Sequence, residues 1–249
     1  SVFGEAAKSS TQLRLEDAYL RGVILDKLAL SGWVFIRCDL RDSSFRDSVC
    51  KNAKFDHCVL DRATFKSASL HDTIFDGSSC KETSYITARL IRSSFVSCQA
   101  YGAKFFHAKA KKANFAGAKL VQAQLQNFVG EGVNFAGAVL KGANFNGAII
   151  NECRITRADL SGAELKGTAA RRSNVEDTKF AGNNLQNADF RGTNFSRVRF
   201  LAITNFESSR FAGTMLQDLV FDGASQKFAE YIESTSKESY EEKIEESSQ

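Results

Sequence analysis

The amino-acid sequence predicts an all-β fold in which the chain winds into a parallel β-helix of about ten square coils, with a helix capping the C-terminal end. Three observations predict this fold. A large apolar residue recurs at every fifth position, a small residue stands two positions before it, and glycine concentrates two positions after it. Residues 134–148, NFAGAVLKGANFNGA, show all three features. Neither an α-helix nor an ordinary strand has a period of five.

The five-residue period is strict over most of the chain. We call the large residue of each unit its centre, i; Leu or Phe fills 28 of the 38 centres that fall on multiples of five from 15 to 200. Ala, Ser, Thr or Cys fills 30 of the 38 positions at i−2, and none of these 76 positions carries Asp, Glu, Lys or Arg. Two inward positions in five require a corner in every unit, so four units close a coil of about 20 residues.

Glycine and proline support the corners. A type II β-turn requires a positive φ at its second central residue, where glycine is unstrained. Fifteen of the 17 glycines stand at i+2, and proline is absent from the chain, as expected for backbone that must donate every N–H. After Phe200 the register shifts, which places one extra residue, and a predicted bulged corner, at 201–205. The later centres are Phe206, Phe211, Leu216 and Phe221.

The period also predicts the domains and the core. We expect an N-terminal cap over residues 1–12, the β-helix over 13–224, and a C-terminal helical cap and acidic tail over 225–249. Phe228, Tyr231 and Ile232 have the spacing of an amphipathic helix, whereas the stretch from about Ser236 could be an exposed helix or disordered. Residues 20 apart should stack, which predicts two aromatic ladders. These are Phe35, Phe55, Phe75, Phe95, Phe115 and Phe135, and Phe45, Phe65, Tyr85 and Phe105.

Two units depart from the pattern. At Gly130 the centre is missing, but Phe128 at i−2 supplies the volume. Ala108 and Ala110 have no such compensation within their own unit, so we expect an indented coil there.

The units ANFAG, ANFNG, ADLSG, ADFRG and TNFSR closely resemble those of the pentapeptide-repeat family, and the resemblance extends from about Leu13 to Ala224. It implies a right-handed quadrilateral β-helix. Some family members resemble B-form DNA in size and charge and protect or inhibit DNA gyrase. That mimicry requires an acidic body, whereas residues 1–224 carry a net charge of +8 and the 225–249 tail carries −4.

The sequence shows no catalytic or metal-binding pattern and no transmembrane run. We expect no enzyme, no cofactor and no metal site. The three histidines, at 57, 71 and 107, fall on different faces of a 20-residue coil. All six cysteines occupy inward positions as small apolar residues, and only Cys38 and Cys58 are coil neighbours within reach of a disulfide. Buried thiols favour the cytoplasm over a lumenal or secreted location. The inward cysteines are Cys38, Cys50, Cys58, Cys80, Cys98 and Cys153.

Function must then depend on the outward positions, where two features are unusual. The first is a band of apolar residues at i+1, which predicts either a partner-binding patch or partial burial at the corners. It comprises Ile86, Ile91, Val96, Tyr101, Phe106 and Val121. The second is a basic strip, which predicts attraction to an acidic partner or an ordinary solvated face. It comprises Lys51, Arg92, Lys111, Lys112, Arg171, Arg172 and Arg191.

These features favour a non-catalytic scaffold that presents rigid faces to a protein partner, possibly as a subunit of a larger assembly. No nucleic acid is expected as a partner, and the oligomeric state stays open. Three alternatives remain: a DNA-mimic inhibitor or protector of DNA gyrase, an interaction module of a secreted bacterial effector, and a lumenal photosynthetic pentapeptide-repeat protein.

Overall fold

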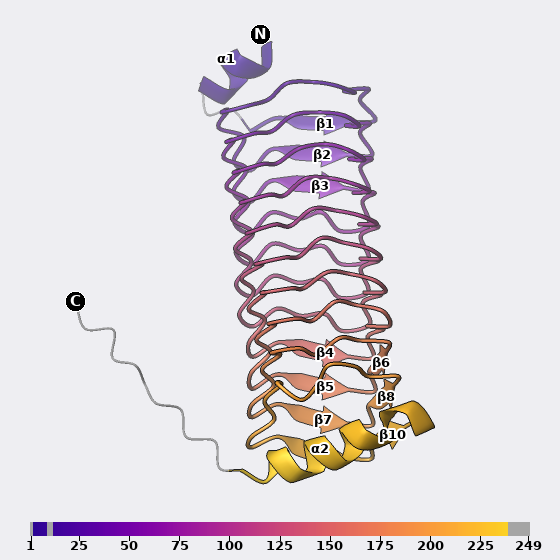
Figure 1. Cartoon of the computed structure of the whole chain (residues 1–249). Helices are drawn as coiled ribbons and strands as arrows, with labels where there is room; N and C mark the ends of the chain where they lie inside the picture. The colour runs from indigo at the N-terminus through magenta and orange to yellow at the C-terminus, as the bar shows by residue number, and fades with distance from the viewer. Residues whose placement is uncertain (1, 9–11, 239–249) are drawn as a thin grey trace, which may run out of the picture.

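The chain forms a column of stacked coils with a helix at each end (Figure 1). The structure is a computed structural model that describes residues 2–8 and 12–238. In chain order its elements are α1 (Val2–Lys8), β1 (Arg14–Glu16), β2 (Val34–Ile36), β3 (Lys54–Asp56), β4 (Arg154–Thr156), β5 (Asn174–Glu176), β6 (Lys179–Ala181), β7 (Asn194–Ser196), β8 (Arg199–Leu201), β9 (Met215–Gln217), β10 (Val220–Phe221), the 3-10 turn η1 (Gly223–Ser225) and α2 (Gln226–Ser236). The predicted parallel β-solenoid of about ten turns with a C-terminal helix is confirmed.

Parallel pairing joins residues one coil apart. The strands form three sheets, in the orders β1-β2-β3, β4-β5-β7-β9 and β6-β8-β10. Elsewhere single parallel bridges keep the same offset, as between Ser84 and Lys104. The strands are short because each five-residue unit leaves only two or three residues extended before the next corner.

The corners are β-turns with left-handed backbone at i+2. The N–H of the third residue after a centre donates to the carbonyl of that centre, as from Ala63 to Leu60 at 2.9 Å. All 38 of the i+2 positions from Asp17 to Ala202 have φ between +49° and +72°, and only 13 of them are glycine. Left-handed backbone costs a residue with a side chain on the order of 1–2 kcal/mol. Stacking of the coils must therefore offset strain at most corners.

The inward positions form one continuous core. Every centre from Leu25 to Phe200 is buried. The predicted ladders are confirmed: Phe35 stacks on Phe55 at 4.9 Å and Phe45 on Phe65 at 4.6 Å between ring centroids. The two ladders also interlock, because Phe45 meets Phe55 edge-to-face at 5.5 Å. Both geometries are favourable for aromatic pairs.

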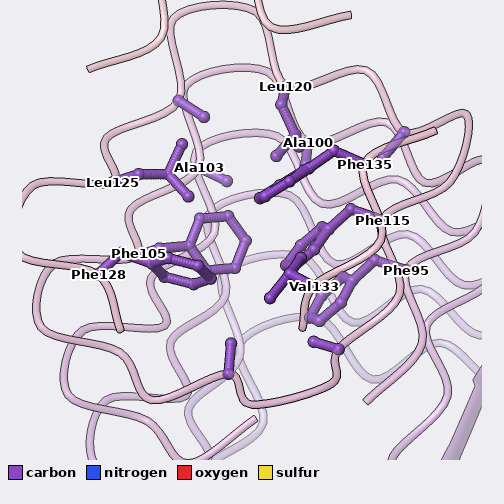
Figure 2. Packing of buried hydrophobic residues seen from close by; sticks show 14 of the residues in the cluster. Phe95, Ala100, Ala103, Phe105, Phe115, Leu120, Leu125, Phe128, Val133 and Phe135 are labelled. Atoms are coloured by element: carbon purple, nitrogen blue, oxygen red, sulfur yellow. The ribbon is translucent and has the colours of Figure 1, made fainter. Parts of the chain in front are cut away.

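Phe128 fills the place of the missing centre at Gly130, as predicted. A Cβ added to Gly130 would lie 2.7 Å from Val133 Cγ2 and 3.1 Å from Phe128 Cζ, with a second Phe128 ring carbon closer still. The Phe128 ring lies 6.4 Å from both Phe105 and Phe115 (Figure 2). Those two rings flank Ala110 in the preceding coil, so volume next to Ala110 comes from the coil that follows. The sequence prediction considered compensation only within one unit and was incomplete for this reason.

The register shift lies at the end of the predicted interval. Asn184 still pairs with Thr204, twenty residues on, whereas Asp189 pairs with Arg210, twenty-one residues on. Asn205 is the extra residue: it is exposed and has a φ of +52°. The insertion therefore bulges outward at a corner and leaves the core pattern intact.

Both helices pack against an end coil. In α1, Phe3 lies 6.3 Å from Trp33, and Ala7 is buried. In α2, Phe228 and Ile232 are fully buried and cover the last coil, which confirms the predicted capping helix. The open question about the stretch from Ser236 concerns mostly residues 239–249, which lie outside the described residues.

Candidate partner-binding surfaces

The 20-residue coil assigns every outward residue to one of four corners. We name them by their i+1 residues: corner A carries residues 21, 41 and so on to 201, corner B 26 to 186, corner C 31 to 191, and corner D 16 to 196. Backbone bonds between successive coils confirm the stacking, as from Glu82 N–H to Tyr101 O at 2.8 Å and from Thr87 N–H to Phe106 O at 2.9 Å. Positions five apart lie on different corners, and positions twenty apart share one.

The six residues of the predicted apolar band therefore do not form one patch. Tyr101 and Val121 stack at corner A, and Ile86 and Phe106 stack at corner B. The remaining two, Ile91 and Val96, lie at corners C and D. All six are half-buried. The band encircles the column, and one rigid partner cannot contact all of it on a single face.

Two adjacent corners do bring four of these residues to one side of the column. The face between corners A and B carries Tyr101 and Val121 along one edge and Ile86 and Phe106 along the other, with Lys104 at the i−1 position between them. We call these five residues the apolar face. Among the described residues, Lys104 makes no ion pair and the Tyr101 hydroxyl makes no hydrogen bond, so both polar groups are available to a partner.

The seven residues of the basic strip all lie on corner C, but carboxylates interrupt and neutralise most of it. Arg92 pairs with Asp72 at 2.6 Å, and Lys111 with Glu131 at 3.0 Å. Arg172 is also paired, with Glu152 at 2.8 Å. The hydrogen bonds from Arg92 hold the pKa of Asp72 below its usual range. Lys51 and Lys112 make no ion pair with any described residue.

At the C-terminal end of the strip one carboxylate serves two guanidinium groups. Asp189 Oδ2 accepts from Arg171 Nε at 2.8 Å and from a terminal nitrogen of Arg191 at 2.7 Å. Burial alone would raise the pKa of Asp189, but the hydrogen bonds from Arg191 and the charge of Arg171 lower it on balance. Asp189 is thus an anion at neutral pH, and this group of three residues has a net positive charge.

The structure places the three histidines on three corners, as the sequence indicates: His57 on corner D, His71 on corner C and His107 on corner B. Burial, together with the nearby charges of Lys51 and Arg89, lowers the pKa of His71. Within residues 2–8 and 12–238, no cluster of three His, Cys, Asp or Glu side chains could hold a metal ion.

The prediction that all six cysteines point inward is confirmed, and all six are free thiols. Cys38 and Cys58 each donate to a backbone carbonyl, that of Leu15 and that of Phe35, at 3.4 Å. Burial raises the pKa of Cys50, Cys58 and Cys153 to about 12, so these thiols stay protonated and unreactive. The chain offers no exposed nucleophilic sulfur among the described residues.

Sequence comparison agrees with this geometry. The profile of the pentapeptide-repeat family, described as "Pentapeptide repeats", matches eight copies within residues 43–79, 131–167 and 158–197. The chain belongs to the pentapeptide-repeat family. No curated protein sequence matches it. Among the helices of the described part, none is long and apolar enough to cross a membrane.

Solved structures of other repeat proteins are similar to the chain. HetL, a regulator of heterocyst differentiation from the cyanobacterium Nostoc, is 16% identical, with 87% of this chain and 92% of HetL covered at a TM-score of 0.46. QnrB1, a plasmid-mediated fluoroquinolone resistance protein, is 18% identical, with coverages of 89% and 98% and a TM-score of 0.46. A pentapeptide-repeat protein of the Arabidopsis thaliana thylakoid lumen is 24% identical, with coverages of 43% and 72% and a TM-score of 0.28. Scores below 0.5 decide nothing about function, which has to be argued from this chain's own surface.

Proposed function

We propose that the protein is a non-catalytic scaffold that binds a protein partner through the apolar face between corners A and B. The observation that carries the proposal is the stacking of Tyr101 on Val121 and of Ile86 on Phe106, on two corners of the same side. Aromatic residues at the centre of a flat surface are the usual anchors of protein interfaces. The unpaired ammonium group of Lys104 between them favours a partner with a carboxylate at the matching position.

The architecture supports a scaffold because its corners and core are repetitive and rigid. Adjacent coils are joined by parallel bridges on each of the four sides, so outward side chains keep fixed spacings along the column. A partner that matches these spacings loses little entropy in binding, because the surface is already ordered. The buried thiols and the dispersed histidines support a role without catalysis.

The gyrase-related function is the second candidate, and it follows from family membership rather than from a site on this chain. The paired charges along corner C do not support it, since a DNA mimic requires an excess of carboxylates. A supercoiling assay with purified DNA gyrase tests it directly: we expect no inhibition and no protection from quinolones. A cytoplasmic location and the effector and lumenal alternatives remain proposals of the sequence.

A pair of matched double variants tests the apolar face. Tyr101→Ser with Phe106→Ser removes one aromatic residue from each edge of the face. The control, Ile91→Ser with Val96→Ser, removes two equally half-buried apolar residues at corners C and D. Each purified variant is immobilised and incubated with native extract, and captured proteins are quantified by mass spectrometry.

We expect the control to retain the partner captured by the wild type, and the face variant to lose at least 90% of it, because each anchor contributes about 2 kcal/mol or more. Circular dichroism and melting temperature verify that both variants fold. Equal capture by the two double variants would refute the apolar face as the binding surface.

A further inference from the structure

The C-terminal end of corner C has more positive charge than its carboxylates can neutralise. Arg171 and Arg191 share the single carboxylate of Asp189. The terminal nitrogens of Arg171 make no hydrogen bond with any described residue. Arg210, which pairs with Asp189 across adjacent coils through the backbone, makes no ion pair within residues 2–8 and 12–238. We call Arg171, Arg172, Arg191 and Arg210 the arginine cluster.

The end of helix α2 is tied to this corner. The Gly213 N–H lies 3.1 Å from the carbonyl oxygens of both Ser236 and Glu238. Gly213 is the i+2 residue of the unit centred on Phe211 and has a φ of +67°. The end of α2 thus takes the place that the next coil would occupy at corner C.

Corner C continues from that point to the arginine cluster without a break. Gly192 N–H, one coil before Gly213, donates to Ala212 O at 3.0 Å, and Arg172 N–H, one coil earlier, donates to Arg191 O at 3.0 Å. With about 4.8 Å per coil, the arginine cluster begins within roughly 10 Å of the point at which the chain leaves α2.

The segment that follows has the opposite charge. Residues 239–249, SYEEKIEESSQ, contain four glutamates and one lysine. Eleven residues span up to about 36 Å when extended. The corner from Gly213 to Lys112 covers five coils, or about 24 Å. The segment is therefore long enough to follow the strip past the arginine cluster as far as Lys112.

We propose that residues 239–249 lie back along corner C, with their glutamates against the arginine cluster. The occupant of this part of the basic strip is then the chain's own acidic segment. An acidic partner could bind there only by displacing it, which makes the segment a competitor built into the protein. The inference uses a different surface from the apolar face and does not depend on it.

Paramagnetic relaxation measures where the segment lies. Ser248→Cys introduces one accessible thiol for a nitroxide label, since all six native thiols are buried. Broadening is then compared between amides of Gly192 and Gly132 at corner C and those of Gly182 and Gly142 at corner A, the diagonally opposite corner. These glycines are matched in residue type and backbone geometry.

We expect at least threefold stronger broadening at corner C than at corner A in low salt. The difference should disappear in 0.5 M NaCl and in a variant with all four segment glutamates changed to glutamine, because exposed charges are screened at about that ionic strength. Equal broadening at both corners would overturn the proposal. So would broadening of isotope-labelled protein by separately spin-labelled protein, because the segment would then bind a second copy.

Discussion

Exchanging the large and small residues at positions 128 and 130 should show whether this core depends on volume or on the position of each side chain. The variant Phe128→Ala with Gly130→Leu restores the ordinary unit, with a small residue at i−2 and leucine at the centre. Each single substitution leaves one position wrong. Phe128→Ala leaves a cavity between the rings of Phe105 and Phe115, whereas Gly130→Leu forces a side chain into space that the Phe128 ring already fills.

The structure indicates the magnitudes. Removing a fully buried phenylalanine side chain costs about 3–5 kcal/mol of unfolding free energy. A leucine at position 130 would begin with a Cβ 2.7 Å from Val133 Cγ2 and closer to the Phe128 ring, an overpacking that costs about 1–3 kcal/mol or more. If the two sites were independent, the double variant would lose about 6 kcal/mol. We expect it to lose less than about 2 kcal/mol, because a volume-conserving exchange of apolar residues is tolerated.

The assay is urea unfolding of the wild type, the two single variants and the double variant, followed by far-ultraviolet circular dichroism. The coupling energy of this cycle should reach about 3 kcal/mol in the stabilising direction, at the upper end of what contacting residues show. An additive double variant would refute the reasoning, since Phe128 and Gly130 would then not share one volume. A Gly130→Leu single variant as stable as the wild type would refute it as well.

Three further predictions concern a hydroxyl, a shared carboxylate and a corner. The Tyr85 hydroxyl is buried with no hydrogen-bond partner in the described part of the chain, so Tyr85→Phe should stabilise the protein by about 1 kcal/mol in urea unfolding; a loss of stability would contradict this. Asp189→Asn leaves Arg171 and Arg191 without their shared anion and should cost about 2 kcal/mol at pH 7, since the carboxylate is buried and both arginines are partly exposed. The folded-state pKa of Asp189 is lowered, so the wild-type advantage should persist above about pH 4 and shrink below it as the carboxylate is protonated; an advantage independent of pH between 7 and 2 would argue against the ion pair. Gly142→Ala should cost about 1 kcal/mol through its φ of +62° alone, because the new methyl group would meet only Gln122 Cγ at 3.6 Å; an unchanged urea midpoint would show that this corner relaxes.

Most of the fold could be predicted because inward and outward positions have different chemistry in every unit. The absence of charge at i and i−2 identifies the core, and a single period of twenty then places Phe35 on Phe55 and Cys38 beside Cys58. The compensation at Gly130 was also predictable, because the large residue stood two positions away. The contribution of Phe128 beside Ala110 was not, because it crosses from one coil to the previous one.

The candidate surfaces were harder to predict, for two physical reasons. A band that is continuous in sequence turns a right angle every five residues, so Ile91 and Val96 were grouped with Tyr101 although they lie on other corners. The signal that could have separated them was present, since only residues twenty apart share a corner. The pairing of Asp189 with two arginines depends on rotamers and burial, which no count of charges by position contains.

The same geometry limits what a partner can recognise on this column. Along one corner the repeat distance is about 4.8 Å, so two side chains twenty residues apart touch the same partner group, whereas two residues five apart are separated by a whole face. A binding site must then be built from stacked pairs on neighbouring corners, as with Tyr101 and Val121 opposite Ile86 and Phe106. Substituting one member of a stacked pair leaves its neighbour on the same spot, and we therefore expect single substitutions at the apolar face to have much smaller effects than substitutions on both of its edges.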